Sequence, residues 1–251
     1  MKKNRIFTML FFFDVYRREK KMDFIKNIGV LITNEKYMGM LWEGLGKTVL
    51  VSVFAALLGL VLGTAVAMVG ISQDSPLMKI PKAICKIYVT VIRGTPMALQ
   101  LFIMAYTIFA IRGFPKEIIA IIAFGINSGA YVSENIRAGI LSVDIGQTEA
   151  GRALGLNGKV TMMKIVIPQA IKNVIPAIGN ELIALIKETS IVSMIGMYDL
   201  TQAAKVIGAG NNMASYIVPM SVAACFYLAI VYTLTFAIKK IEGRLRAGDN
   251  R

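Results

Sequence analysis

The most chemically informative residues in this sequence are ionised side chains inside long apolar segments. Arg93 lies in an apolar segment over residues 87–111, and Glu181 lies in another over residues 173–190. A charge within a membrane segment usually faces a cavity or an ionic partner, because a lone charge in lipid is costly. The segment around Glu181 is too short and too polar for lipid exposure, so it should line a path enclosed by protein. Arg93 could instead snorkel or form a structural ion pair.

Residues for covalent catalysis are scarce. The sequence has no His among its 251 residues, which excludes His-based acid–base catalysis and His metal ligands. Cys85 and Cys225 are far apart and form no CxxC pair, so no disulfide framework is indicated. No nucleophile–base set and no metal-ligand cluster is present in the sequence. We therefore expect no catalytic residue, no metal site and no enzyme activity.

Composition places the chain in a membrane. Hydrophobic residues make up 56% of the sequence, and the mean hydropathy is +0.63. Apolar runs of about 18 residues or more indicate membrane helices. We expect an all-α, polytopic protein with five spans, at about residues 48–69, 87–111, 118–136, 173–190 and 214–238. The net charge of +13 does not indicate a nucleic-acid partner, because the cations flank these spans.

Several local patterns refine the spans. Gly59 and Gly63 have GxxxG spacing, which favours close approach of another helix, although glycine is also tolerated in membrane helices. Pro96 interrupts the backbone hydrogen bonds of the second span. Glu134 and Arg137 are one turn apart in the third span and are placed to pair with each other.

A basic amphipathic segment precedes the second span. Its apolar residues share one helical face, at Leu77, Ile80, Ile84 and Ile87. Its lysines share another, at Lys79, Lys82 and Lys86. This pattern predicts a segment that lies on the inner membrane surface.

A polar stretch between the third and fourth spans, residues 148–168, has the features of a short helix. Thr148 is a suitable N-cap, and Glu149 then places a carboxylate at the positive end of the helix dipole. Gly155 can end the helix in a left-handed turn. A narrow face of small apolar residues lies between them, at Ala150, Ala153 and Leu154. Such a helix, about 9 Å long from Glu149 to Leu154, is marginal alone and needs a groove in which to dock; the alternative is an ordinary cytoplasmic loop.

The same stretch resembles the EAA loop of ABC importer membrane subunits. The family pattern is Glu-Ala-Ala, three residues, Gly, nine residues, Ile, one residue and Leu-Pro. Every gap matches here, with Glu149, Ala150, Gly151, Gly155, Ile165, Ile167 and Pro168. The chain departs at Gly151, which lowers helix propensity by about 1 kcal/mol relative to Ala and so softens docking, and at Ile167. In the family this loop is the coupling helix, which sits in a groove of the ATP-hydrolysing subunit. The resemblance implies coupling residues at Glu149, Ala150, Gly151, Ala153, Leu154 and Gly155.

Three further strings are similar to those of permeases for polar amino acids, such as glutamine, histidine, arginine and cystine. They are Arg93–Pro96, Asn127–Arg137 and the string GNELIALIKETSI, which has Glu188 for Asp and Ile191 for Leu. The resemblance covers about Trp42 to the C-terminus. It implies a type I ABC importer membrane-subunit fold over residues 42–243, after an N-terminal extension and lead-in at 1–41 and before a basic tail at 244–251.

The resemblance also implies partners and a location. We expect a bacterial inner-membrane protein that pairs with a second copy of itself or a paralogous permease. Two ATP-binding cassette subunits would carry the ATP and Mg²⁺, so that this chain binds no cofactor. An extracellular or periplasmic substrate-binding protein would deliver the solute.

For a zwitterionic substrate, charge suggests the binding residues. A carboxylate needs a cation and an ammonium needs an anion, which makes Arg93 and Glu181 the candidates. Uncharged polar candidates for the same pathway are Thr95, Gln100, Asn127, Ser128 and Asn180. Importers of methionine or a metal are alternatives within the class. A passive channel is a further alternative, although a channel would not need the Glu149 loop.

Five spans place the two termini on opposite sides. A basic tail with Lys239, Lys240, Arg244, Arg246 and Arg251 predicts a cytoplasmic C-terminus. The basic amphipathic segment and the Glu149 loop then also lie inside. Only residues 1–21, which are basic, disagree. Their apolar run, Ile6–Phe13, is too short to span and is a signal-like core, an interfacial anchor or the product of an upstream start, with Met22 as the alternative start.

Overall fold

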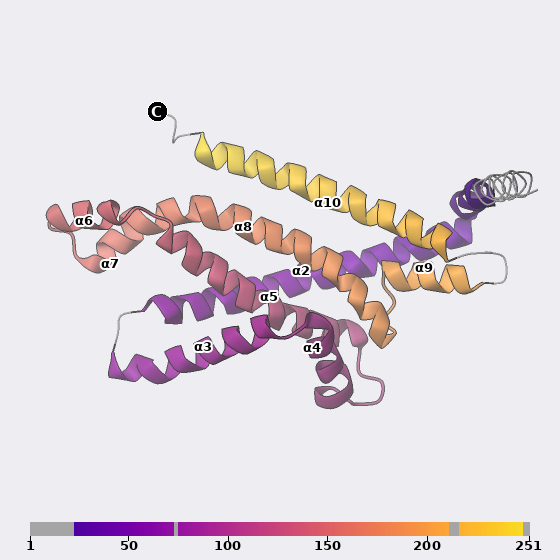
Figure 1. Cartoon of the computed structure of the whole chain (residues 1–251), viewed down its shortest axis with the longest axis horizontal. Helices are drawn as coiled ribbons and strands as arrows, with labels where there is room; N and C mark the ends of the chain where they lie inside the picture. The colour runs from indigo at the N-terminus through magenta and orange to yellow at the C-terminus, as the bar shows by residue number, and fades with distance from the viewer. Residues whose placement is uncertain (1–22, 73–74, 211–215, 248–251) are drawn as a thin grey trace, which may run out of the picture.

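The computed structural model describes residues 23–72, 75–210 and 216–247, and these ranges are almost entirely helical (Figure 1). The all-α class expected from the apolar spans is confirmed. The hypotheses about residues 1–21, and the end of the basic tail at 248–251, lie outside the described residues.

The longest helix, α2, covers Glu35–Ile71 and contains the whole first expected span. It packs along α5, Lys116–Leu141. A Cβ added to Gly59 would lie 2.8 Å from the Cβ of Ser128, and one added to Gly63 would lie 2.7 Å from the carbonyl oxygen of Gly129. The close helix approach predicted from the GxxxG spacing is therefore confirmed.

An ion pair also joins α2 to the first turn of α5. The ammonium of Lys47 donates to Oε1 of Glu117 at 2.9 Å, and both side chains are about one-third exposed, at 39% and 33%. The ammonium lowers the pKa of Glu117, chiefly through this hydrogen bond. The pair therefore holds the two helices together at the end where α5 begins.

The second expected span is not one straight helix. The helix α3, Lys79–Gly94, follows a short 3₁₀ turn at Pro76–Met78. It is bent by 109° relative to α4, Met97–Ile103, which continues into one π-helical turn at Met104–Ile108. The break lies at Pro96, as the missing proline N–H requires. The amphipathic segment is not separate from this span, because α3 runs through it without interruption.

Most of the fourth expected span, residues 173–188, lies in α8, Ile167–Glu188, which carries Pro176 in its interior. A 3₁₀ segment, Thr189–Ile195, follows and ends at Gly196, where φ is +68°. The next helix, α9, covers Leu200–Ala209 and was not among the elements expected from the sequence. The last helix, α10, covers Ile217–Arg246 and therefore includes the first three residues of the basic tail, 244–246.

Two buried clusters hold these helices together. The first joins α2, α4, α5 and α8 through residues that include Val51, Leu101, Phe124 and Leu185. The second joins α2, α9 and α10 through residues that include Leu41, Leu200, Ile207 and Val218. Where these helices lie in lipid, close van der Waals packing of these side chains, rather than their removal from water, stabilises the contacts.

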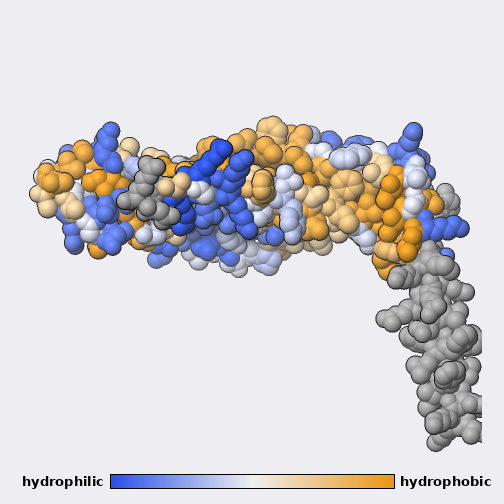
Figure 2. All heavy atoms as spheres, turned by 90° about the horizontal axis from the view of Figure 1, so that it is seen from above, coloured by the Kyte–Doolittle hydropathy of each residue, from blue (hydrophilic) through white to orange (hydrophobic). Residues whose placement is uncertain are grey.

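The elongated molecule has distinct ends. The short helices α6, Ile145–Ala153, and α7, Gly158–Thr161, form one end, which we call the α6 end (Figure 1). The C-terminal end of α2, the start of α3 and the C-terminal end of α10 lie toward the α6 end, and α9 lies toward the other. Hydrophilic residues gather around the C-terminal part of α10 (Figure 2). Hydrophobic residues cover much of the surface between that part and the end opposite to α6 (Figure 2).

Length and composition alone identify fewer membrane helices than the five expected. Among the described residues, α2 and α10 are long and apolar enough to cross a membrane, and the bent α3–α4 pair is a third if it counts as one span. The helices α5 and α8 do not meet this criterion, and both carry charged residues within their length. They pack against each other and against α2, so protein covers much of their surface.

Candidate functional site

The short helix expected near Glu149 is present, but it begins earlier. The helix α6 starts at Ile145, and Oδ1 of its N-cap Asp144 accepts a hydrogen bond from the backbone N–H of Gly146 at 2.6 Å. Thr148 lies inside the helix, so its assignment as the N-cap is wrong. The nine residues make a helix about 13 Å long at 1.5 Å per residue, longer than expected.

The C-terminal end of α6 has the turn that the sequence predicted. Gly155 has a φ of +81°, which confirms the left-handed turn. The backbone N–H of Gly155 donates to the carbonyl of Arg152 at 2.9 Å, and that of Leu156 donates to the carbonyl of Gly151 at 3.1 Å. This pair of bonds is a Schellman motif, which satisfies two carbonyls that the helix end would leave unpaired.

Gly151 faces inward, toward α7. A Cβ at this position would lie 2.8 Å from Cγ2 of Thr161 and 3.0 Å from Cδ1 of Ile165. Thr161 is buried and donates its hydroxyl to the carbonyl of Asn157 at 3.1 Å, so its side chain has little freedom to move. Glycine therefore allows α6 to pack closely on α7 and on the π-helical turn Met162–Val166.

The outer surface of this hairpin is exposed and partly apolar. Glu149, Ala150 and Ala153 are exposed, and Leu154 is 80% exposed. Ile145 and Met163 are also exposed, at 75% and 57%, and were not among the residues expected at this surface. Exposed apolar side chains on a short helix are the residues that a groove in a partner protein would cover.

A polar network lies at the α3–α4 bend. Nε2 of Gln100 donates to the carbonyl oxygen of Ile92 at 2.8 Å and to Oγ1 of Thr95 at 2.7 Å. Nδ2 of Asn127, on α5, donates to Oε1 of Gln100 at 2.9 Å. Three of the expected pathway residues are therefore brought together, and their side chains bind one another.

A second group joins α5 to α8. The Glu181 carboxylate lies near the side chain of Ser128, which is buried on α5, and the two interact. Asn180 is exposed and has no side-chain hydrogen bond within the described part of the chain. Glu181 and Ser128 thus form one contact, and Asn180 lies beside them in sequence without joining it.

The sequence hypothesis made Arg93 the partner of a substrate carboxylate, but in the structure its guanidinium already has a protein partner. Its guanidinium lies 3.4 Å from Oε2 of Glu134 and 5.3 Å from the ring centre of Tyr131. Glu134 also accepts two hydrogen bonds from Arg137, at 3.0 and 2.9 Å, so the pairing expected one turn apart is present. The described residues contain no direct ion pair between Arg93 and Glu181; the structural pairing kept open for Arg93 is what the structure shows.

Comparison with known proteins places this arrangement in a family. The sequence model of the family "Binding-protein-dependent transport system inner membrane component" matches residues 59–247. The chain belongs to this family.

Two curated relatives and one solved structure are similar to this permease over most of its length. The arginine transport system permease protein ArtQ of Bacillus subtilis (strain 168) is 40% identical over 209 residues, which is 82% of this chain and 93% of ArtQ. A putative glutamine transport system permease protein GlnP of Rickettsia typhi (strain ATCC VR-144 / Wilmington) is 39% identical over 206 residues, covering 81% and 91%. The crystal structure of an amino acid ABC transporter with histidines matches with a TM-score of 0.77 and 36% identity, over 85% of this chain and 98% of that chain.

These comparisons establish the broad assignment. The chain is an ABC transporter permease with the type I importer fold, and it is a multi-pass protein of the bacterial inner membrane. It is a transport subunit of an importer, not an enzyme.

Proposed function

We propose that this permease carries a polar amino acid across the membrane by alternating access, driven by a separate ATP-binding cassette subunit. The observation that carries the proposal is α6, a capped helix with exposed apolar side chains at one end of the bundle. The named relatives transport arginine or, putatively, glutamine, which supports a polar amino acid over methionine or a metal.

The coupling role follows from the position of α6 in the chain. It lies directly between α5 and α8, and these helices carry the polar candidates Asn127, Ser128 and Glu181. When ATP binding closes the partner subunits, a helix seated in each groove moves with its groove. The closely packed Gly151 transmits that movement through α7 to the start of α8. The path between two permease subunits then opens to each side in turn.

We propose the energy source and the remaining partners from the family of this permease and from the coupling role of α6. ATP and Mg²⁺ bind to the cassette subunits, a second permease completes the path, and a substrate-binding protein supplies the solute. We place the α6 end in the cytoplasm, since the basic C-terminal part of α10 and the start of α3 lie toward it (Figure 1). The C-terminus is then cytoplasmic.

The structure changes the roles that we propose for the candidate substrate-binding residues. Glu181 remains the candidate for the substrate ammonium or a basic side chain, with Ser128 and Asn180 beside it. Arg93 can attract the substrate carboxylate only in competition with Glu134, which already binds it. Thr95, Gln100 and Asn127 act mainly on the shape of the path, because their side chains bind one another.

The decisive experiment is uptake into proteoliposomes. The permease, its cassette subunit and its substrate-binding protein are reconstituted with ATP on the side of the cassette subunit, and a panel of labelled amino acids is offered with methionine included. We expect ATP-dependent uptake of a polar amino acid. Uptake by the permease alone, without the cassette subunit, would indicate a passive channel and contradict the proposal.

A further inference from the structure

The two faces of α3 have unequal surroundings. The apolar residues Ile80, Ile84 and Ile87 are 62–72% exposed, so none of the described residues covers this face. The basic residues Lys86 and Arg93 instead line a cavity between α3, α2 and α5. A helix resting on the membrane surface would turn its cations outward to water and headgroups. Here Lys86 and Arg93 line a space between α3, α2 and α5 that is open to the surface, and their side chains remain exposed.

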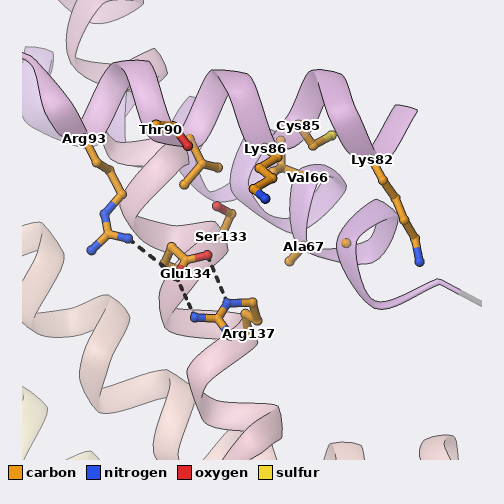
Figure 3. A pocket seen from close by; sticks show the side chains of 12 residues that line it. Val66, Ala67, Lys82, Cys85, Lys86, Thr90, Arg93, Ser133, Glu134 and Arg137 are labelled. Atoms are coloured by element: carbon orange, nitrogen blue, oxygen red, sulfur yellow. Dashed lines mark hydrogen bonds and ion pairs between the residues drawn. The ribbon is translucent and has the colours of Figure 1, made fainter. Parts of the chain in front are cut away.

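This cavity has a volume of about 520 Å³ and a mixed lining. Val66, Ala67 and Val89 form an apolar wall. Figure 3 shows Lys86 and Arg93 extending from α3 toward Glu134 and Arg137 on α5. The lining follows α3 from Lys82, in the part of the helix that lies toward the α6 end (Figure 1), to Arg93, near its C-terminal end. Lys82 and Lys86 therefore lie closer to the membrane surface at the α6 end than Arg93 does.

The charges that line the cavity do not balance. Arg93 and Arg137 share the single carboxylate Glu134, at 3.4 and 2.9 Å. Lys86 has no hydrogen bond or ion pair with any described residue. Lys82, at the edge of the cavity, is a further cation, and it donates to the carbonyl of Ser72 at 2.7 Å. Even without Lys82, three cations against one carboxylate leave two net positive charges, which are costly beside lipid without an anion.

We infer that this cavity binds the phosphate headgroup of an anionic phospholipid from the inner leaflet. Phosphate oxygens accept hydrogen bonds from guanidinium and ammonium groups, and basic pockets between membrane helices on the cytoplasmic side hold such headgroups. The apolar wall accommodates the adjoining hydrocarbon, which a free phosphate ion would leave in contact with water. The lipid would neutralise Lys86 and tie α3 to α2 and α5.

The test uses the complete transporter, with its cassette subunits, in nanodiscs of phosphatidylcholine with or without phosphatidylglycerol. Cys85 lines the cavity and serves as the probe, through its rate of modification by a neutral maleimide measured by peptide mass spectrometry. Cys225, on α10 and outside the cavity lining, is the internal reference. We expect phosphatidylglycerol to slow the modification of Cys85 several-fold relative to Cys225. Equal relative rates in the two lipids would overturn the inference, and this comparison needs no variant.

A matched pair of variants separates a site from general charge attraction. Lys86→Gln removes a cavity cation and should abolish the protection of Cys85. Lys79→Gln makes the same charge change on the same helix but outside the cavity lining, and should keep it. Loss of protection in both variants would contradict a defined site. Inorganic phosphate added to phosphatidylcholine nanodiscs is the last arm, and full protection by phosphate alone would overturn the lipid as the ligand.

Discussion

The side-chain amide of Gln100 donates a hydrogen bond to the carbonyl oxygen of Ile92 at 2.8 Å. Ile92 is four residues before Pro96, and a proline has no N–H with which to satisfy that carbonyl. Gln100 therefore replaces the backbone donor that the proline removes, and its own carbonyl is held by Asn127. In an apolar surrounding an unsatisfied carbonyl costs several kcal/mol, so Gln100 stabilises the 109° bend.

The first prediction concerns Gln100. Gln100→Leu keeps the approximate volume but removes both hydrogen-bonding groups, which leaves the Ile92 carbonyl and the Asn127 amide unpaired. We expect a loss of about 1–3 kcal/mol in the free energy of unfolding, measured in detergent. Gln202→Leu is the control, because the Gln202 side chain makes no hydrogen bond within the described ranges. An equal effect of the two substitutions would contradict the role of Gln100.

The second prediction concerns the packing of α6. Gly151→Ala restores the residue of the family pattern and raises helix propensity by about 1 kcal/mol. The new Cβ would lie 2.8 Å from Cγ2 of Thr161, and overpacking of this kind costs about 1–3 kcal/mol. We expect net destabilisation and less uptake per ATP hydrolysed.

A double variant tests the cause. Thr161→Ser removes Cγ2 and keeps the hydroxyl that binds Asn157, so Gly151→Ala with Thr161→Ser should recover most of the loss. The measurement is the thermal midpoint together with the ratio of uptake to ATP hydrolysis. A Gly151→Ala variant more stable than the parent would show that propensity outweighs packing here.

The third prediction is a pH dependence at Glu117, which lies ahead of the expected third span. Lys47 lowers the pKa of Glu117 below 4.5, so the folded state binds this proton less tightly than the unfolded state. The stability from the pair is present above pH 4.5 and is lost as the pH falls through the lowered pKa. Because both side chains are about one-third exposed, the contribution is at most about 1 kcal/mol.

Thermal unfolding of the parent and of Glu117→Gln over a series of pH values measures this contribution. We expect the difference in midpoint to be largest near neutral pH and to shrink below pH 4.5. Glu35→Gln, an exposed residue in the first turn of α2, is the control for removal of one carboxylate. A difference that grows on acidification would have the wrong sign and would exclude the pairing.

The sequence predicted features that depend on local backbone geometry or on short spacing. Gly155 at a helix end and the glycine pair at Gly59 and Gly63 are of this kind, because a left-handed turn and a close approach both require the missing Cβ. The cap at Asp144 was missed because Thr148 also has capping chemistry, and the choice depends on where α5 ends. The helix α9 was missed because it is short and stabilised by contacts with α2 and α10.

The pairing of the charged residues could not be predicted for a similar reason. Arg93 and Glu134 are far apart in sequence, and only the packing of α3 on α5 brings them to 3.4 Å. The i to i+3 pair of Glu134 and Arg137 was accessible, since helical spacing alone defines it. Spacing defines neighbours within one helix, whereas contacts between helices depend on the bend at Pro96.

The fourth prediction concerns Glu181 and the substrate. Glu181→Gln keeps the size and the contact with Ser128 but removes the negative charge. If Glu181 binds a cationic group of the substrate, the half-saturation constant for uptake should rise about tenfold or more, because one lost ionic contact is worth about 1.5–3 kcal/mol. Glu188→Gln, at the exposed end of the same helix, is the control. An unchanged half-saturation constant in Glu181→Gln would remove this residue from the substrate site.

The fifth prediction tests whether a substitution at Gly155 acts through backbone strain or through contact of the new side chain. A Cβ at this position would meet no atom within 4 Å, so a substitution acts through the backbone, whose φ of +81° costs a β-branched residue about 1–2 kcal/mol. Gly155→Val should therefore distort the end of α6 and reduce uptake more than ATP hydrolysis by the cassette subunit. Gly155→Asn should retain more coupling, because Asn tolerates the left-handed region. Uptake per ATP hydrolysed is the measurement, and equal coupling in parent, Val and Asn variants would mean that the geometry of this turn does not transmit the motion.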